Sequence, residues 1–191
     1  MSFNDAYLGT PPWDIGRPQS AFRALADAGE LRGRVLDAGC GTGEHACMAA
    51  SLGLDATGID DAPLAIEKAR AKARERELDV RFAVGSVLEL ATLDERWDTL
   101  LDCGVFHVFD DDDRAAYVRS LAAAVEPGGR YFMLCFSDTQ PGGIGPRRVS
   151  KAEIHAAFAA GWRIDAIEPA AIETTLDDRD ASAWLSTITR V

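Results

Sequence analysis

Cysteine is scarce in this chain of 191 residues, and its four cysteines form no Cys-x-x-Cys pair. They stand at positions 40, 47, 103 and 135, each in apolar or glycine-rich surroundings. Zinc sites need clustered ligands, which such scattered cysteines do not provide. We therefore expect buried free thiols, a reducing compartment and a cytoplasmic protein.

Long hydrophobic runs and a surplus of positive charge are also lacking. No window approaches about 18 consecutive apolar residues, so no membrane-spanning helix is expected. Residues 1–9 show no basic patch followed by an apolar stretch, as a secretory signal would. Lys and Arg number 20 against 31 Asp and Glu, a net charge of −11 that argues against a nucleic-acid partner. Neither repeats nor low-complexity tracts are visible, so we expect residues 1–191 to form a single domain.

The sequence does contain a glycine-rich turn. Residues 35–46 read Val-Leu-Asp-Ala-Gly-Cys-Gly-Thr-Gly-Glu-His-Ala, an apolar run that ends in an acid and leads through three glycines into a helix-like stretch. Glycine lets the backbone approach a ligand, and a helix start offers free N–H groups and partial positive charge. A strand, a tight turn and a helix N-terminus are predicted, and together they can hold an anionic, nucleotide-like ligand.

The spacing of the glycines narrows the choice of ligand. The dinucleotide fingerprint requires a glycine where this chain has Glu44. Asp-x-Gly-x-Gly-x-Gly instead resembles motif I of the class I S-adenosylmethionine (SAM) methyltransferases. That resemblance implies SAM as cofactor and S-adenosylhomocysteine (SAH) as product, with the amino-acid tail of the cofactor near Gly39, Cys40 and Gly41. Its ammonium needs an acceptor, which is Asp37 or a backbone carbonyl of the turn.

A second apolar run, residues 54–59, ends in Asp60, which lies 21 residues after Gly39. An acid at this spacing can accept hydrogen bonds from both ribose hydroxyls. A solvated aspartate that caps the next helix is the alternative, and the co-occurrence of turn and acid favours ribose binding. We place Asp61 in the same cofactor site.

Apolar periodicity predicts alternating helices and strands. Helices are expected over residues 19–28, 43–52, 63–77, 113–125 and 150–160, and further strands over 80–84, 97–103, 130–137, 162–167 and 183–189. Such alternation implies a parallel sheet. The Pro127-Gly128-Gly129 turn, the strand 97–103 with its following loop, and the paired final strands extend the methyltransferase resemblance. It implies an α/β, Rossmann-like doubly wound seven-stranded sheet of order 3-2-1-4-5-7-6, with strand 7 antiparallel.

Adenine recognition departs from the family. After the third strand the family usually has an acid that binds the adenine amino group, whereas this chain has Ser86. A serine oxygen accepts more weakly than a carboxylate, and a backbone contact near Val87 is equally possible. Asp102, in the fourth strand, is also assigned to the cofactor site.

The substrate end is predicted around three segments. Residues 10–18 hold Trp13 among prolines, and this Pro-Trp-Asp segment resembles a subgroup of small-molecule methyltransferases that act on thiopurines, halides or thiols, tellurite, and heterocycles or quinones. Either Trp13 fills a groove on the domain, or residues 1–18 form a lid over the cofactor and substrate. In the lid, Trp13 can face the sulfonium. His107, after the fourth strand, either accepts a proton or orders its loop. Phe106 and Phe136 are expected to shape the pocket, and Arg147 either binds an anionic group or pairs with surface acids.

The resulting hypothesis is a SAM-dependent methyltransferase that modifies an oxygen, sulfur or nitrogen of a small molecule. Acids 110–113 are interpreted as a helix N-terminus, and no metal is expected. A non-catalytic SAM-binding module and an NAD(P)-dependent oxidoreductase are the alternatives, the latter disfavoured by Glu44 and by the lack of a Tyr-x-x-x-Lys pair. The predicted partner is a small-molecule methyl acceptor, with no nucleic acid or membrane, and the protein is expected to be a monomer or weak homodimer.

Overall fold

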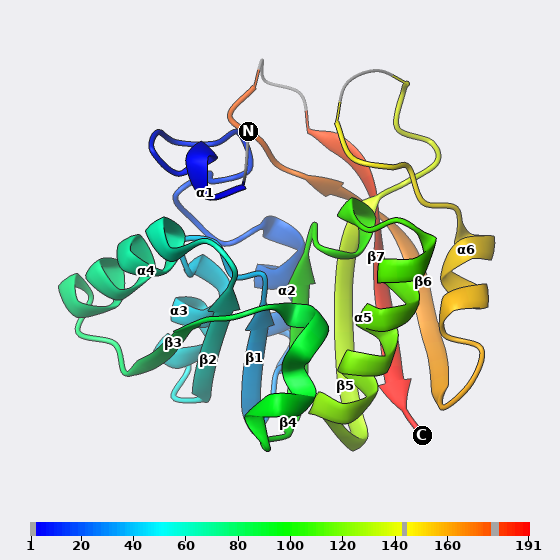
Figure 1. Ribbon diagram of the computed structural model, residues 1–191, viewed down its shortest axis with the longest axis horizontal. Helices are drawn as coiled ribbons and strands as arrows, with labels where there is room; N and C mark the ends of the chain where they lie inside the picture. Colours follow the sequence, from blue (N-terminus) through cyan, green and yellow to red (C-terminus); the bar gives the residue numbers. More distant parts are fainter. Residues whose placement is uncertain (1–2, 143–144, 177–179) are drawn as a thin grey trace.

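The sheet has the predicted strand order. A computed structural model describes residues 3–142, 145–176 and 180–191, and its seven strands are ordered β3-β2-β1-β4-β5-β7-β6 (Figure 1). β7 pairs antiparallel with both of its neighbours, and the other pairings are parallel. The strands are β1 (Arg34–Ala38), β2 (Asp55–Asp60), β3 (Val80–Val84), β4 (Trp97–Cys103), β5 (Val125–Phe136), β6 (Trp162–Ile172) and β7 (Ala181–Arg190).

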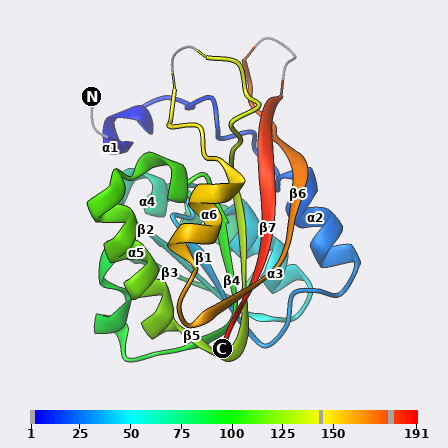
Figure 2. The ribbon, with the colours of Figure 1, turned by 90° about the vertical axis from the view of Figure 1, so that its right-hand side faces the viewer.

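Helices cover both faces of the sheet. Side chains of α2 (Ser20–Asp27), α3 (Glu44–Ser51) and α4 (Pro63–Glu75) pack on one face, and those of η1 (Val87–Leu93), α5 (Asp111–Ala124) and α6 (Lys151–Ala157) pack on the other. Figure 2 shows α5 and α2 on opposite sides of the strands. Two short elements, α1 (Phe3–Ala6) and η2 (Phe106–Val108), lie next to the strand ends. Within the described residues, no helix is long and apolar enough to span a membrane.

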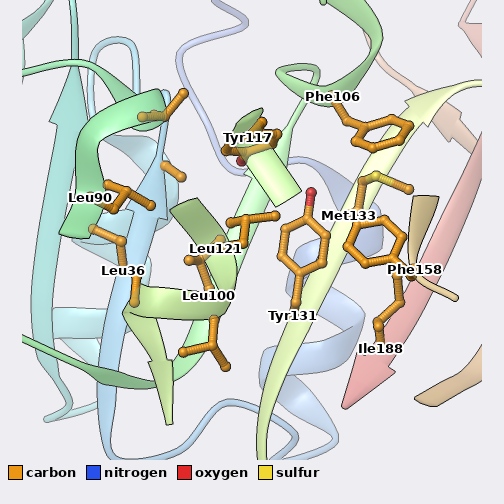
Figure 3. Close-up of a cluster of buried hydrophobic side chains, with 14 of the residues drawn as sticks. Leu36, Leu90, Leu100, Phe106, Tyr117, Leu121, Tyr131, Met133, Phe158 and Ile188 are labelled. Atoms are coloured by element: carbon orange, nitrogen blue, oxygen red, sulfur yellow. The ribbon is translucent and has the colours of Figure 1, made fainter. Parts of the chain in front are cut away.

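The larger core lies between the sheet and α5. Leu36 and Leu100 from β1 and β4 meet Leu121 from α5, and all three are fully buried (Figure 3). Tyr131 and Phe158 extend the cluster toward β7, with ring centroids 5.6 Å apart. Close-packed side chains of this kind fix the relative position of the strand ends, because an interior at crystal-like density deforms little.

The last strands are longer than periodicity predicted. β6 continues to Ile172 and includes Pro169, which pairs with Trp184. Proline has no backbone N–H to donate, so a proline in the sequence argues against a central strand. An edge strand such as β6 tolerates it, because one side of the strand has no partner. β5 likewise begins at Val125 and takes in the Pro-Gly-Gly turn. A capping box of Ser150 and Glu153 begins α6, within the range predicted as a helix.

The topology places the candidate site. β1, β2 and β4 are parallel neighbours, so their carboxyl ends share one edge of the sheet. The chain from α1 to α2 crosses above this edge, and the connections around β5, β6 and β7 rise beside it (Figure 1). Ligands of open α/β sheets bind at such an edge.

Two glycines at the ends of α3 allow a matched stability test. Gly43 (φ 81°) and Gly53 (φ 78°) have similar left-handed backbones, but a Cβ at Gly43 would lie 2.6 Å from the Phe82 ring, whereas one at Gly53 would meet nothing within 4 Å. Gly53→Ala should cost about 1–2 kcal/mol of unfolding free energy from backbone strain alone. Gly43→Ala should cost a further ~1–3 kcal/mol from overpacking, as measured by urea denaturation. Equal losses in the two variants would contradict this packing role for Gly43.

Candidate active site

A pocket of about 1000 Å³ lies at the carboxyl ends of the strands. One side, the turn wall, comes from the loops after β1, β2 and β3, and the opposite side, the apolar wall, comes from the loops after β4, β5 and β6. Of the predicted site residues, those that line the pocket are Trp13, Gly39, Cys40, Gly41, Asp60, Asp61, Ser86, Val87, His107, Phe136 and Arg147. Asp37, Asp102 and Phe106 are not among the lining residues.

Asp60 organises the turn wall. Its Oδ2 accepts a hydrogen bond from the Gly41 amide at 2.8 Å, and its Oδ1 accepts one from the Ala62 amide at 2.9 Å. Each carboxylate oxygen can accept more than one bond, so both keep capacity for a ligand hydroxyl. Burial raises the pKa of Asp60 above its usual value. The side chain therefore joins the turn after β1 to the turn after β2 and still faces the pocket.

The first two glycines of the turn let the side chains of Val105 and Tyr7 lie close to its backbone. Gly39 and Gly41 have φ values of 67° and 52°. A Cβ at Gly39 would collide with the Val105 side chain, and one at Gly41 would lie 2.8 Å from the Tyr7 hydroxyl oxygen. A bulkier residue at either glycine would therefore displace the neighbouring side chain, Val105 or Tyr7.

Asp37 lies beneath the turn, where it is 1% exposed. Its Oδ2 accepts from the Ala46 amide at 3.1 Å, while its Oδ1 has no hydrogen-bond partner among the described residues. The nearest basic atom to Oδ1 is His45 Nδ1 at 3.9 Å. Burial raises the pKa of Asp37 to about 7. An unpartnered acceptor oxygen below the turn suits a cationic donor placed on the turn wall.

The loop after β3 contributes a serine hydroxyl to the pocket. Ser86 Oγ accepts from the Leu88 amide at 3.2 Å and so begins η1. The hydroxyl retains acceptor capacity, and Val87 follows as the first residue of η1, where an N–H has no intrahelical partner. Both residues line the pocket beside Asp61.

The prediction that Asp102 contacts the cofactor is wrong. The residue is fully buried, and its Oδ2 accepts from the hydroxyls of Tyr131 at 2.6 Å and Tyr117 at 3.0 Å. Its Oδ1 accepts from the Val105 amide at 2.8 Å, so the side chain holds the bend after β4. Burial raises its pKa to about 6. Tyrosines from α5 and β5 supply the donors, and Asp102 serves the site by shaping that bend.

Phe106 is also wrongly assigned to the substrate pocket. Its ring is fully buried, stacks on Phe158 with centroids 5.8 Å apart, and lies 4.5 Å below the Arg114 guanidinium. The bend held by Asp102 sends this side chain into the core, while the next residue, His107, faces the pocket.

His107 does not have the hydrogen bonding of a general base. Its Nδ1 accepts a hydrogen bond from the Phe136 amide at 2.9 Å. In a neutral imidazole one nitrogen accepts and the other carries the proton, so Nε2 is the N–H donor. Burial, with the nearby charges of Arg114 and Arg148, lowers the pKa of His107 to about 3. The ring is neutral at physiological pH, and its pocket-side nitrogen has no free electron pair.

The N-terminal segment is tied to both sides of the pocket. Asp14 Oδ1 accepts from Thr42 Oγ1 in the glycine turn at 3.0 Å, and the Pro12 carbonyl accepts from the Thr175 amide beyond β6 at 2.9 Å. Trp13 Nε1 donates to the Tyr7 hydroxyl at 3.0 Å. Sequence reasoning missed Tyr7 and Thr175, because each meets its partner only through the tertiary fold.

The apolar wall consists of Val108, Phe109, Phe136, Pro146, Ile172 and Leu176. Arg147 reaches the pocket, but Asp111 and Glu153 each bind one of its terminal nitrogens, so its charge is already paired. Of the two predicted roles of Arg147, the structure shows the pairing with surface acids and not the anion site. In the loop that carries Arg147, residues 143–144 lie outside the described part.

The thiols near the pocket are not activated. Burial raises the pKa of Cys40 and of Cys103, both of which line the pocket. Cys103 is only partly buried, unlike the other three cysteines. Among the described residues, no group of three or more potential metal ligands is present, and Asp110 of the acidic run caps α5 by accepting from the Asp113 amide.

Comparisons with known proteins agree on the family. A family model described as a methyltransferase domain matches residues 35–129, from β1 to the start of β5. The chain is 37% identical to the 2-heptyl-1-hydroxyquinolin-4(1H)-one methyltransferase of Mycobacteroides abscessus, over 84% of this chain and 72% of that protein.

Solved structures share the fold of this chain. A protein studied for the conversion of a disulfide bond into a thioacetal group in echinomycin biosynthesis is 37% identical, with a TM-score of 0.90 over 98% of this chain and 91% of that one. Magnesium protoporphyrin IX methyltransferase of Synechocystis, solved with bound SAM, is 21% identical and shares the fold, with a TM-score of 0.71 over 90% of this chain and 77% of that one.

The buried carboxylate of Asp102 generates a pH-dependent prediction. Its folded pKa of about 6 exceeds the ordinary value of 3.8, so its contribution to stability is lost as pH rises through about 6. Tyr131→Phe removes a donor to the ionised form and should raise that pKa further. The variant should lose about 1–3 kcal/mol of unfolding free energy at pH 8 and clearly less at pH 5, measured by urea denaturation.

Asp102→Asn is the matched background for that measurement. With no carboxylate to titrate, the effect of Tyr131→Phe should become independent of pH. An equal loss at pH 5 and pH 8 with Asp102 intact would contradict the assigned network.

Proposed function

This chain belongs to the methyltransferase-domain family and is a SAM-dependent methyltransferase, and from that premise we propose that it methylates an oxygen, sulfur or nitrogen atom of a small, lipophilic molecule. The observation that carries the proposal is the pocket itself, in which a polar turn wall and an apolar wall face each other. Two ligands of different chemistry fit such a site, one held by hydrogen bonds and one by burial of apolar surface.

The turn wall fits the three polar parts of SAM. Asp60 would accept from the ribose hydroxyls, and Ser86 with the Val87 amide would meet the adenine. The amino-acid tail would lie along Gly39 to Gly41, with its ammonium above the unpartnered Asp37 Oδ1. When bound, the cofactor supplies an electrophilic methyl group on its sulfonium. The residues of the turn wall would hold that methyl toward the apolar wall.

The apolar wall supports a lipophilic acceptor over a bare anion. Aliphatic and aromatic side chains make up most of the described part of this wall, and Arg147, a cation that lines it, is already paired with two acids. A planar heterocycle would bury apolar surface there, and each Å² of buried apolar surface favours binding by about 25 cal/mol. The relative from Mycobacteroides abscessus is named for such a heterocycle, a hydroxyquinolinone.

The N-terminal segment, residues 1–18, is proposed as the lid of this domain. Its described part bridges the turn wall at Thr42 and the β6–β7 connection at Thr175. Trp13 lines the pocket and is 44% exposed, so a bound ligand can cover more of its ring. A closed segment would exclude water and hold the acceptor in line with the donor sulfur.

Cofactor binding through Asp60 is tested with a second aspartate on the same strand. Asp60→Asn should weaken SAH binding about 10- to 100-fold, because an amide is a poorer acceptor for two ribose hydroxyls than a carboxylate. Asp55→Asn, at the exposed start of β2, should leave the affinity unchanged. Calorimetric titration measures both, and thermal melting of the free variants separates weak binding from misfolding. Wild-type affinity in Asp60→Asn would contradict the assignment.

The acceptor class is tested by a screen and a surface variant. Hydroxyquinolinones, thiopurines, thiophenols and quinols should be methylated, and iodide should not, as measured by SAH formation. Leu176→Asp should raise KM for a lipophilic acceptor about tenfold, because it removes apolar surface from the wall. Leu52→Asp, at a similar exposure (52% against 58%) but away from the pocket, is the control. Turnover of iodide alone would contradict the proposed class.

A further inference from the structure

His107 lies at the junction of the two walls, and a backbone hydrogen bond determines which of its ring nitrogens carries the proton. The Phe136 amide donates to Nδ1, so in the neutral ring the proton resides on Nε2. Nε2 lies beside Gly104, where a Cβ would come within 3.2 Å of it. Gly104 and His107 both line the pocket, and no described residue bonds to Nε2. The structure therefore presents one unpartnered N–H group to the ligand space.

Among the residues that the structure describes, no other side chain on this side of the pocket can take a proton. The carboxylates that line the pocket belong to the turn wall, its helix or the N-terminal segment: Asp14, Glu44, Asp60 and Asp61. Near the apolar wall the titratable groups are Cys103, whose thiol pKa is raised by burial, and Arg147, a cation. Within the described part of this wall, a bound acceptor would meet a hydrogen-bond donor and no base.

The surrounding charge favours a negative ligand atom at the same place. Arg114, from α5, and Arg148, from the loop after β5, add to burial in disfavouring protonation of His107. Arg114 Nη1 is also paired with Glu153 Oε1 at 3.3 Å. Arg148 lies 5.8 Å above the Phe136 ring, and its Nε is buried without a partner among the described residues. Burial is the larger cause of the lowered pKa of His107, and the positive charges of the two arginines, which add to it, would stabilise an anion beside the ring.

We propose that the enzyme binds its methyl acceptor as a preformed anion, whose charged heteroatom accepts a hydrogen bond from His107 Nε2. The inference rests on the proposed function, and it narrows the substrate class to heteroatom acids that ionise near neutral pH. N-hydroxy heterocycles, acidic phenols and aromatic thiols belong to this class, whereas aliphatic alcohols do not. His107 is then a binding and orienting group, and the acceptor proton leaves to water before the complex forms.

The reaction balances without an enzyme base. An electron pair of the ionised heteroatom forms the new bond to the methyl carbon as the carbon–sulfur bond breaks. The bonding pair of the broken bond stays on sulfur, so the sulfonium becomes the neutral thioether of SAH. The anionic and cationic charges cancel, and no proton remains to be removed.

A dead-end complex tests the inference without turnover. The probes are 1-hydroxyquinolin-4-one and 4-nitrothiophenol, whose acid and anion forms differ in absorbance, each titrated with pH in the presence of saturating SAH. Binding should lower the pKa of each probe by about one to two units, which corresponds to a 10- to 100-fold preference for the anion. An unchanged or raised pKa, or failure of both probes to bind, would overturn the proposal.

Two His107 variants separate a donor from a base. His107→Gln keeps an N–H group and should retain most of the pKa shift and, in turnover, at least a third of kcat/KM. His107→Leu keeps the volume but not the donor, and should lose the shift and about 10- to 100-fold in kcat/KM. SAH affinity measured by calorimetry should be unchanged in both, which shows that they fold. Loss of activity in His107→Gln as large as in His107→Leu would overturn the donor role.

The pH dependence of turnover distinguishes this inference from the proposed function. For two acceptors of different acidity, the acid limb of the kcat/KM profile should move with the pKa of each free acceptor. If both acceptors instead showed the same acid limb, and His107→Gln abolished it, the limb would belong to the enzyme. That result would uphold methyl transfer and overturn the binding of a preformed anion. Anion binding in the dead-end complex without any methyl transfer would uphold the anion site and overturn the proposed methyl transfer.

Discussion

The carboxylate of Asp60 is the constraint on which the turn wall of the pocket depends. One oxygen holds the amide of Gly41 and the other holds the amide of Ala62, so the turns after β1 and β2 keep a fixed relation. The glycines allow this because side chains at positions 39 and 41 would displace Val105 and Tyr7. A rigid, backbone-lined wall results, which can bind a nucleoside without rearranging.

A second buried carboxylate plays the matching role on the acceptor side. Asp102 collects two tyrosine hydroxyls and the backbone of the bend after β4. That bend sends Phe106 into the core and His107 to the pocket. The amide of Phe136 then fixes the tautomer of His107 from β5. Each wall is thus positioned by an acid that the fold buries, and the ligand-facing chemistry is set by what remains exposed.

The family resemblance predicted the sheet order, and local patterns predicted residues that line the turn wall. Glycines in a tight turn, an acid at the end of β2 and a Pro-Gly-Gly turn each act over a few residues, so they can be read from sequence. The errors at Asp102 and Phe106 have a different origin, because their surroundings come from residues 15 to 52 positions away, Tyr117 and Tyr131 for the first and Phe158 for the second. The role of His107 depended on one backbone hydrogen bond across 29 positions, which no spacing rule reveals.

The central claim is that one pocket holds the methyl donor on the turn wall and presents it to the apolar wall past His107. A crystal structure with bound SAH tests this most directly. The account predicts both ribose hydroxyls within about 3 Å of the Asp60 carboxylate, adenine beside Ser86 and Val87, and sulfur facing Gly104 and His107. A nucleoside bound on the apolar wall, or a sulfur turned away from His107, would contradict it.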